Sequence, residues 1–196
     1  IIFNIIIIKK ILNLYQFMKK KNKQVGWCII VYGFSGAGKT AISKKIKKKI
    51  EKILGKTILI DGDELRIFFS KIGMNFGYTK KERDKSVIPK LELLNLILNQ
   101  NINIIYPTIF LNKLAINKWS KNIKNLVKVH IKTDINEIIK FGVKKEFYTK
   151  NKNIVGKDIK AVFPKKPLIT IENNFKKNID TLANETFTKI KKKLNN

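Results

Sequence analysis

Short, mostly apolar runs recur along the chain and are the first regularity in its pattern of hydrophobic and polar positions. Each run is bounded by polar or glycine-containing segments. Such runs are typical of strands that are buried on both faces, as in a parallel sheet. The runs that predict strands are residues 27–31, 57–60, 102–106, 126–131 and 168–171.

Between these runs, apolar residues recur at the spacing of an amphipathic helix. Ile42, Ile46, Ile50 and Ile53 follow the first run with lysines between them, which places the isoleucines on one helical face. Other helices are predicted over about 111–123, after Asp134, and in the C-terminal stretch with Leu182, Phe187, Ile190 and Leu194. Strands that alternate with helices predict an α/β fold, with one doubly wound, mainly parallel sheet and helices on both faces.

One predicted helix has both a start signal and an internal proline. Residues 79–82 read Thr-Lys-Lys-Glu, which fits a capping box, because the threonine and glutamate side chains can satisfy free backbone N–H groups. Val87, Leu91 and Leu94 share one face of the helix that follows. Pro89 lies inside this pattern, so we expect it to kink the helix or to delay its start.

The first 17 residues are apolar but are interrupted by Lys9 and Lys10. Their longest unbroken stretch is too short to span a bilayer as a helix, and they show no clear signal-peptide pattern. Because Met18 lies a short distance before the first predicted strand, we expect residues 1–17 to be an over-extended or non-structural segment. Residues 18–196 are expected to form one domain. A membrane-surface anchor is the alternative for the segment.

The chain is strongly basic, with 42 Lys and Arg against 14 Asp and Glu and a formal net charge of +28. Such a charge is often a sign of nucleic-acid or membrane-surface binding. Here lysine, isoleucine and asparagine are all abundant, and the lysines are spread along the chain. AT-rich codons account for all three residue types, so we expect no specific nucleic-acid partner. A basic surface still favours the approach of anionic nucleotides.

Cys28 is the only cysteine and lies inside the first predicted strand. It cannot form an internal disulfide, which fits a reducing cytoplasm, and we expect it to be a small buried apolar residue. His130 is the only histidine and lies in the fourth predicted strand. Because no second histidine exists, we expect no histidine-based metal site and interpret His130 as structural.

Residues 33–40 read Gly-Phe-Ser-Gly-Ala-Gly-Lys-Thr and match the G-x-x-x-x-G-K-T phosphate-binding loop, or P-loop. A strand precedes the motif and a helix follows it, as the motif requires. The glycines let backbone N–H groups surround phosphate oxygens, and the helix N-terminus adds its positive dipole end. Lys39 is expected to reach the β- and γ-phosphates of ATP, and the Thr40 hydroxyl to bind Mg²⁺. The candidate ATP-binding residues are Gly33, Ser35, Gly36, Ala37, Gly38, Lys39 and Thr40.

This motif makes the predicted sheet one of the P-loop NTPase type. A glycine-rich turn that opens an ordinary helix is the plainer alternative. The motif alone does not distinguish a kinase from a GTPase or a motor. An acidic stretch, Asp-Gly-Asp-Glu-Leu-Arg at residues 61–66, follows the second predicted strand and is the second candidate motif. The carboxyl ends of parallel strands are where ligands bind in open α/β sheets.

Several motifs in order along the chain resemble those of the adenylylsulfate kinase family. Residues 33–40 are similar to its G-L-S-G-x-G-K-[ST] signature, residues 61–66 to D-G-D-x-x-R, and residues 77–83 to G-[FY]-S-x-x-x-R. Residues 145–148 (Lys-Glu-Phe-Tyr) are similar to K-G-L-Y, and residues 153–158 (Asn-Ile-Val-Gly-Lys-Asp) to N-F-T-G-I-D. The resemblance extends over most of the chain and implies a P-loop kinase domain.

The resemblance implies transfer of the ATP γ-phosphate to the 3′-hydroxyl of adenylylsulfate, as in sulfate assimilation. Lys39 and Mg²⁺ would neutralise charge on the phosphoryl oxygens. Asp63 is the candidate catalytic residue that orients the acceptor hydroxyl and takes its proton. Asp61 would hold a Mg²⁺-bound water, and Arg66 and Arg83 would hold the phosphosulfate of the acceptor.

Arg66 and Arg83 are the only arginines in the chain, so 40 of the 42 basic residues are lysines. Both arginines fall on motif positions. A guanidinium can grip phosphate or sulfate oxygens bidentately, which an ammonium cannot. We therefore expect both to bind substrate, and a structural ion pair is the alternative for each.

The chain also departs from the family pattern around the acceptor. The family stacks the acceptor adenine between two aromatic rings. Tyr78 keeps the first ring and is expected to stack on the base. Ile154 stands at the position of the second ring, where we expect its aliphatic side chain to pack on the acceptor base. Ser86 replaces an asparagine. The lysine-rich region 141–165 is expected to be a lid over the nucleotides, although it lacks the arginine of the family.

Three functions stay open from the sequence. The leading one is an adenylylsulfate kinase. The second is a related kinase for another nucleotide-linked acceptor, because residues 154–158 are closer to the V-V-G-x-D of kinase-like relatives associated with surface polysaccharides. The third is a nucleotide-binding protein with weak catalysis, which Pro89 and the altered lid motivate. The expected partners are small-molecule nucleotides. We expect no membrane-spanning segment. A homodimer is one possible oligomeric state, which the sequence does not decide.

Overall fold

The computed structural model describes residues 24–141, 144–165 and 169–195. In these residues, five strands form one parallel sheet in the order β2-β3-β1-β4-β5. The strands are β1 (Cys28–Tyr32), β2 (Thr57–Leu59), β3 (Asn103–Thr108), β4 (Leu126–Lys132) and β5 (Ile169–Glu172). The five strands predicted from apolar runs are thus confirmed, with ends shifted by one or two residues. The expectation for residues 1–17 lies outside the described residues.

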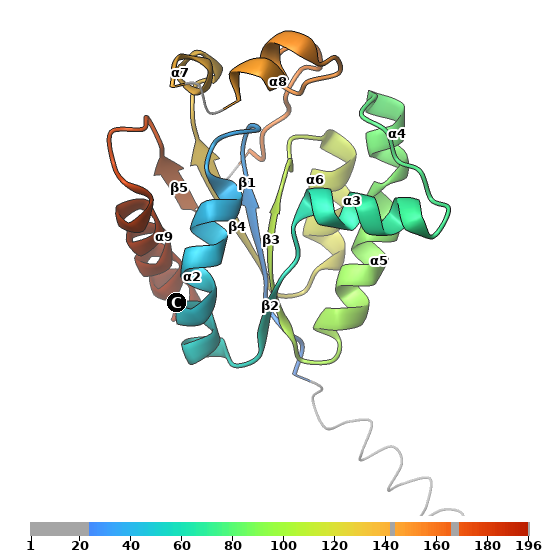
Figure 1. Ribbon diagram of the computed structural model, residues 1–196. Helices are drawn as coiled ribbons and strands as arrows, with labels where there is room; N and C mark the ends of the chain where they lie inside the picture. The colour runs from blue at the N-terminus through green and yellow to red at the C-terminus, as the bar shows by residue number, and fades with distance from the viewer. Residues whose placement is uncertain (1–23, 142–143, 166–168, 196) are drawn as a thin grey trace, which may run out of the picture.

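Helices cover both faces of the sheet (Figure 1). They are α2 (Lys39–Leu54), α3 (Gly62–Lys71), α4 (Lys80–Lys85), α5 (Val87–Leu98), α6 (Lys113–Asn122), α7 (Ile135–Lys140), α8 (Lys145–Lys150) and α9 (Ile179–Leu194). Helices α2 and α9 pack on one face, against Ile29 and Val31 of β1. Helices α3, α5 and α6 pack on the other, against Cys28, Ile30 and Tyr32. Because both faces are covered, every residue of β1 is buried, and the doubly wound α/β prediction is confirmed.

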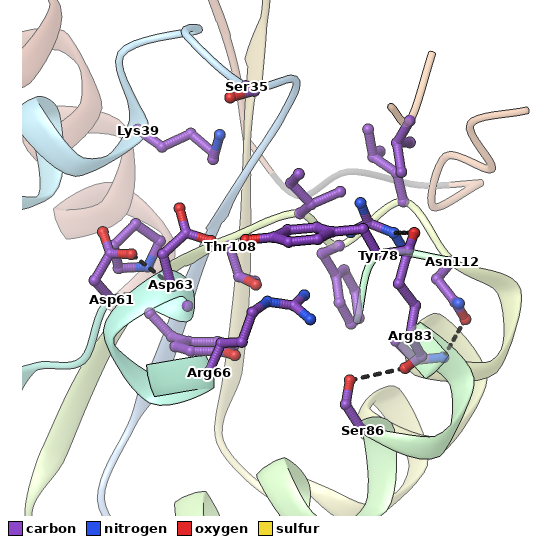
Figure 2. A pocket seen from close by; sticks show the side chains of 18 of the residues that line it. Ser35, Lys39, Asp61, Asp63, Arg66, Tyr78, Arg83, Ser86, Thr108 and Asn112 are labelled. Carbon is purple, nitrogen blue, oxygen red and sulfur yellow. Dashed lines mark hydrogen bonds between the residues drawn. The ribbon is translucent and has the colours of Figure 1, made fainter. Parts of the chain in front are cut away.

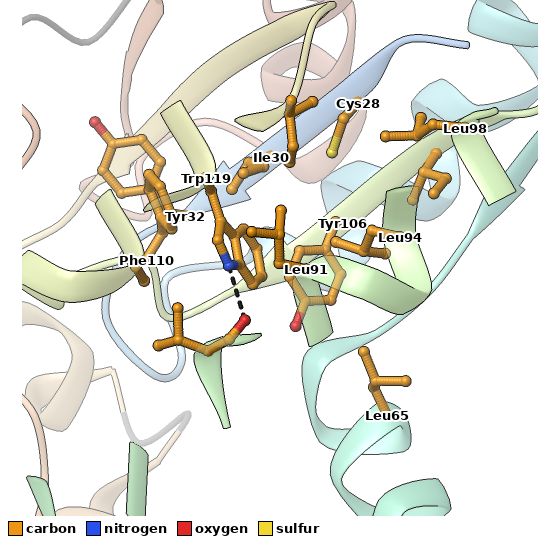
Figure 3. Close-up of a cluster of buried hydrophobic side chains, with 14 of the residues drawn as sticks. Cys28, Ile30, Tyr32, Leu65, Leu91, Leu94, Leu98, Tyr106, Phe110 and Trp119 are labelled. Atoms are coloured by element: carbon orange, nitrogen blue, oxygen red, sulfur yellow. Dashed lines mark hydrogen bonds between the residues drawn. The ribbon is translucent and has the colours of Figure 1, made fainter. Parts of the chain in front are cut away.

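Figure 3 shows the cluster under α3, α5 and α6. Trp119 of α6 lies at its centre, 5.3 Å from the Tyr106 ring and 5.6 Å from the Phe110 ring, measured between centroids. The indole Nε1 donates a 3.0 Å hydrogen bond to the Val87 carbonyl of α5, so the one polar atom of this buried ring is satisfied. Cys28 is buried in the same cluster, as expected. This cluster holds α5 and α6 against the sheet and forms one wall of the cleft described below.

The predicted helix that starts at Thr79 is divided in two. Its capping box is confirmed: the Thr79 hydroxyl accepts from the Glu82 N–H, and the Glu82 carboxylate accepts from the Thr79 N–H. Helix α4 ends at Lys85, and α5 begins at Val87, with Ser86 as the capping residue between them. Pro89 lies in the first turn of α5, where a backbone N–H has no helical partner to lose. The proline therefore delays the start of the apolar helix, as predicted, and does not kink its interior.

Strand β3 contains a proline although it lies between two other strands. The Ile104 N–H donates to Trp27 on the β1 side, and the Asn103 N–H donates to Lys56 on the β2 side. By this alternation Pro107 faces the β2 side, beyond the last β2–β3 pair, Leu59 with Ile105. The missing N–H of Pro107 therefore costs no ladder hydrogen bond. The early end of β2 leaves Pro107 and Thr108 free to line the cleft.

Residues 144–165, which we call the lid segment, lie with α7 over the carboxyl end of β1 (Figure 1). The Tyr148 hydroxyl donates a 2.9 Å hydrogen bond to the carbonyl of Ser35 in the P-loop. The Phe163 ring lies edge-on to Phe34, with centroids 5.9 Å apart. The lid segment therefore contacts the P-loop directly. In the part of the chain that the structure describes, no helix has the length and apolar composition needed to cross a bilayer.

Candidate active site

A cleft of about 580 Å³ opens at the carboxyl ends of β1, β2 and β3. The P-loop and α3 form one end, and α4, α5 and the lid segment form the other (Figure 2). Ten of the residues that the sequence predicts for the site line it: Ser35, Gly36, Gly38, Lys39, Thr40, Asp61, Asp63, Arg66, Tyr78 and Arg83. Gly33, Ala37 and Ile154 are not in the lining.

The P-loop connects β1 to α2 through glycines in left-handed conformations. Gly36 and Gly38 have φ angles of 84° and 91°, which side chains strongly disfavour. A Cβ at Gly36 would also lie 2.8 Å from Ile138. Gly38 precedes α2 without a capping side chain, and the first turn of α2 has no acidic residue. The first N–H groups of α2 therefore suit an anion.

Lys39 points its ammonium into this loop. Its Nζ donates a 2.7 Å hydrogen bond to the Phe34 carbonyl. Burial lowers the pKa of Lys39 to about 8, and the carboxylates of Asp63 and Asp61 only partly oppose that effect. A desolvated ammonium of this kind is stabilised by an anionic partner, which a nucleotide phosphate would supply.

Thr40 and Asp61 lie side by side at the first turn of α2. The Thr40 hydroxyl donates a 2.6 Å hydrogen bond to Asp61 Oδ2, and Asp61 Oδ1 accepts from the Asp63 N–H at 2.9 Å. Asp61 thereby caps α3, a helix that the apolar pattern did not predict. Mg²⁺ prefers one or two protein oxygens together with phosphates and waters. One hydroxyl and one carboxylate at the phosphate end of the cleft fit that requirement.

The two arginines meet at Tyr78, whose side chain is half exposed. The guanidinium carbons of Arg66 and Arg83 lie 4.4 and 5.5 Å from the Tyr78 ring centroid. Arg66 donates to the carbonyls of Phe76 and Gly77. Arg83 donates to the carbonyls of Tyr78 at 2.8 Å and Asn153 at 3.2 Å.

Neither arginine makes an ion pair with another described residue, so the structural ion-pair alternative is not supported, and both donate to backbone carbonyls. Arg66 fixes the loop that carries Tyr78. Arg83 joins this loop to the lid segment at Asn153. Burial, followed by the charge of Arg66, lowers the pKa of Arg83. Both guanidiniums line the cleft, but in this structure several of their N–H groups hold the protein itself.

Ile154 does not face the cleft, which corrects the expectation that it packs on the acceptor base. Its side chain is 2% exposed and packs against Ile138 and Tyr148. The turn at 154–159 explains this orientation, since Ile154 O accepts from the N–H groups of Lys157, Asp158 and Ile159. Neighbouring side chains point to opposite sides of an extended chain, and it is Val155 and Ile159 that line the cleft.

We therefore expect Ile154→Phe to destabilise the protein rather than to improve the site. A larger ring in this packed cluster should cost about 1–3 kcal/mol through overpacking. Urea unfolding and acceptor titration on the same sample measure both effects. Tighter acceptor binding at unchanged stability would show that Ile154 reaches the base.

Sequence reasoning missed several cleft residues, of which Lys90 is the most unusual. It is 7% exposed and lines the cleft from α5. The signal was available, because Val87, Lys90, Leu91 and Leu94 follow helical spacing, so the lysine shares the apolar face. Thr108 and Asn112 also line the cleft (Figure 2), and no motif marks them.

Asn173 supports the site from outside the cleft, directly after β5. Its buried side chain donates a 3.0 Å hydrogen bond to the carbonyl of Ala37. This bond fixes the P-loop backbone just before Gly38. Ala37 itself is fully buried, so its contribution to the site is its backbone.

The family model of adenylylsulphate kinases matches residues 25–172, a span that contains the P-loop, the cleft and the lid segment. The chain belongs to the adenylylsulphate kinase family. It is 28% identical to the cytidine diphosphoramidate kinase of Campylobacter jejuni over 166 residues, which cover 82% of this chain and 92% of the relative. It is 26% identical to the adenylyl-sulfate kinase of Pseudomonas aeruginosa over 161 residues, 79% of each chain.

Among solved structures, the fold is similar to that of the Mycobacterium tuberculosis APS kinase CysC in complex with AMPPNP and APS. The two structures superimpose with a TM-score of 0.71 at 20% sequence identity. The match covers 85% of this chain and 98% of the other. This likeness confirms the P-loop kinase fold of the family. Together with the sequence relatives it makes the protein an ATP-dependent phosphotransferase.

Proposed function

We propose that this member of the adenylylsulphate kinase family transfers the γ-phosphate of ATP to a hydroxyl of a nucleotide whose phosphate carries a second anionic group. One observation carries the proposal. The cleft has Lys39 and Thr40 at one end, Arg66, Arg83 and Tyr78 at the other, and Asp63 between them (Figure 2). The two ends suit two nucleotides that meet at a carboxylate.

In this proposal each side chain acts where its geometry places it. The α2 N-terminus and Lys39 bind the phosphates of ATP and neutralise charge on the transferred group. Asp63 orients the acceptor hydroxyl and accepts its proton as the new O–P bond forms. Thr40 and Asp61 would hold Mg²⁺, Asp61 through a water, and this ion would supply further neutralisation of phosphoryl charge. Tyr78 presents a stacking face, which the arginines hold in place.

Adenylylsulfate is the first candidate acceptor. The product would then be 3′-phosphoadenylylsulfate, and the pathway sulfate assimilation. The orientation of Ile154 favours a second candidate, cytidine diphosphoramidate. This compound is the substrate given in the name of the Campylobacter jejuni relative, cytidine diphosphoramidate kinase. Ile154 supplies no second ring for an adenine sandwich, and the residues of its turn that line the cleft, Val155 and Ile159, are aliphatic. This turn therefore offers less stacking area than an adenine held between two rings would use.

ADP release with each acceptor at saturating ATP and Mg²⁺ tests the proposal. We expect acceptor-dependent ADP release with one of the two, and a higher kcat/KM for that acceptor identifies it. Adenosine monophosphate and cytidine monophosphate serve as controls that lack the second anionic group. ATP binding without turnover on any nucleotide of the panel would contradict the proposal and support a nucleotide-binding protein with weak catalysis.

Tyr78→Ala should raise the acceptor KM much more than the ATP KM. Stacking of a base on an aromatic ring contributes about 1–3 kcal/mol, which corresponds to about 5- to 150-fold in KM. Tyr78→Phe keeps the ring and is the matched control. Equal losses for ATP and acceptor would show that the ring supports the cleft as a whole.

A further inference from the structure

Lys90 is a buried lysine on an otherwise apolar helix face. It lies in the first turns of α5, between Val87 and Leu94, which both pack in the core. Its side chain is almost as buried as theirs, yet it lines the acceptor end of the cleft together with Arg66 and Arg83. An aliphatic residue would suit this helical position better for packing alone.

No partner for the Lys90 ammonium exists among the described residues. The ion pairs there do not include it, and no side-chain hydrogen bond involves it. Burial lowers the pKa of Lys90 to about 8, the charges of Arg66 and Arg83 add to the effect, and Asp63 opposes it. A buried cation without a counter-ion destabilises a fold. Residues that oppose stability in this way are concentrated at functional sites.

The neighbouring arginines use part of their hydrogen-bonding capacity on the protein itself. Arg66 donates to two carbonyls of the Tyr78 loop, and Arg83 donates to Tyr78 and Asn153. Lys90 has three N–H donors and no protein acceptor for any of them in the described residues. Each arginine keeps some free N–H groups, the buried Nε of Arg66 among them. Lys90 is the buried cation of this end with all of its donors left for a ligand.

We propose that Lys90 is an acceptor-recognition residue whose ammonium binds the second anionic group of the acceptor nucleotide, next to Arg66 and Arg83. This inference rests on the proposed function and names the substrate class more closely. Three buried or half-buried cations face one carboxylate, Asp63, at this end. Lys80 of α4 also lines the cleft, so positive charge exceeds negative charge at this end. Such an excess suits two adjacent anionic centres, as in a phosphosulfate or a diphosphate derivative. A nucleoside monophosphate would leave Lys90 without a partner.

The first test compares Lys90→Met, Lys90→Arg and the control Lys85→Met. Lys85 is exposed on α4 and does not line the cleft, so its loss removes the same charge from the same region. With the acceptor that supports turnover, we expect Lys90→Met to raise the acceptor KM at least 20-fold with less than a threefold change in ATP KM. Lys90→Arg should stay within about fivefold of wild type, and Lys85→Met within twofold.

Stability separates recognition from a structural role. Because most of the Lys90 side chain is buried and its ammonium has no partner among the described residues, Lys90→Met should unfold at the same temperature as wild type or at a higher one. A fall of several degrees, or equal KM increases for both substrates, would overturn the proposal. The same holds if Lys90→Met leaves the acceptor KM unchanged.

A binding measurement decides the point even if neither acceptor supports turnover. The P-loop is first saturated with a non-hydrolysable ATP analogue and Mg²⁺, and inorganic pyrophosphate is then titrated as the probe. We expect pyrophosphate to raise the melting temperature of wild type and Lys85→Met, but not of Lys90→Met. No shift in wild type, or an equal shift in Lys90→Met, would refute the role of Lys90. Failure of the acceptor panel alone would refute only the proposed function.

Discussion

Lys39→Ala should lower kcat/KM by about 10³-fold or more while the protein keeps its fold. The ammonium lies in the P-loop and donates to the Phe34 carbonyl, so its loss removes no apolar core contact. Removal of a single preorganised donor from developing charge costs about 10²–10³ in rate, and Lys39 carries a full charge as well. ADP release and circular dichroism on the same sample measure both properties.

Lys44→Ala is the matched control, because Lys44 is exposed on the same helix. It should retain wild-type turnover. Near-normal turnover of Lys39→Ala would contradict the assignment of the P-loop as the phosphate site. Loss of the circular dichroism spectrum would instead show that Lys39 supports the loop structure.

The lowered pKa of Lys39 adds a pH signature to the same prediction. In the free protein Lys39 has a pKa of about 8, so near pH 8 to 9 a sizeable fraction of it is neutral. Phosphate binding favours the charged form and raises this pKa. ATP binding should therefore take up protons near pH 8 to 9. The uptake from Lys39 should vanish below about pH 7, where the group is already protonated. Calorimetry in buffers of different ionisation enthalpy detects the uptake, and Lys39→Ala should abolish it.

Asp63→Asn should lower kcat by about 10²–10⁴-fold, the usual range for a general base, with a much smaller change in acceptor KM. Its side chain is exposed in the cleft, at the first turn of α3. The amide keeps the shape and can still hydrogen-bond a hydroxyl, but it cannot take the proton. Steady-state kinetics with varied acceptor separates the two parameters.

Glu64→Gln is the control for Asp63→Asn. Glu64 is exposed in the same helical turn and does not line the cleft, so this change removes an equal charge without touching the site. An increase in acceptor KM at unchanged kcat would show that Asp63 binds the acceptor and that another group takes the proton.

Local patterns were sufficient for most of the architecture. The five strands, the capping box at Thr79 and the delayed helix at Pro89 follow from rules that act within a few residues. Helix α3 was missed because apolar residues lie on both of its faces. Leu65 and Phe69 are buried, whereas Ile67 and Phe68 are 58% and 46% exposed. Its start depends on Asp61, which was interpreted only as part of a motif.

The candidate site likewise has a part that the sequence predicted and a part that it did not. By itself the sequence determined the P-loop, the acidic turn at Asp61 and Asp63, and the presence of Arg66 and Arg83 in the motifs that line the cleft, because each motif encodes its own backbone geometry. The tertiary structure decided where side chains point. The turn at 154–159 buries Ile154, and Arg83 donates to Asn153, a carbonyl 70 residues away. Lys90 depends on both levels. Helical spacing places it on the buried face, and only the packing of α5 beside the cleft makes that face part of the cleft lining. Contacts between distant segments depend on how the layers pack, which no local pattern records.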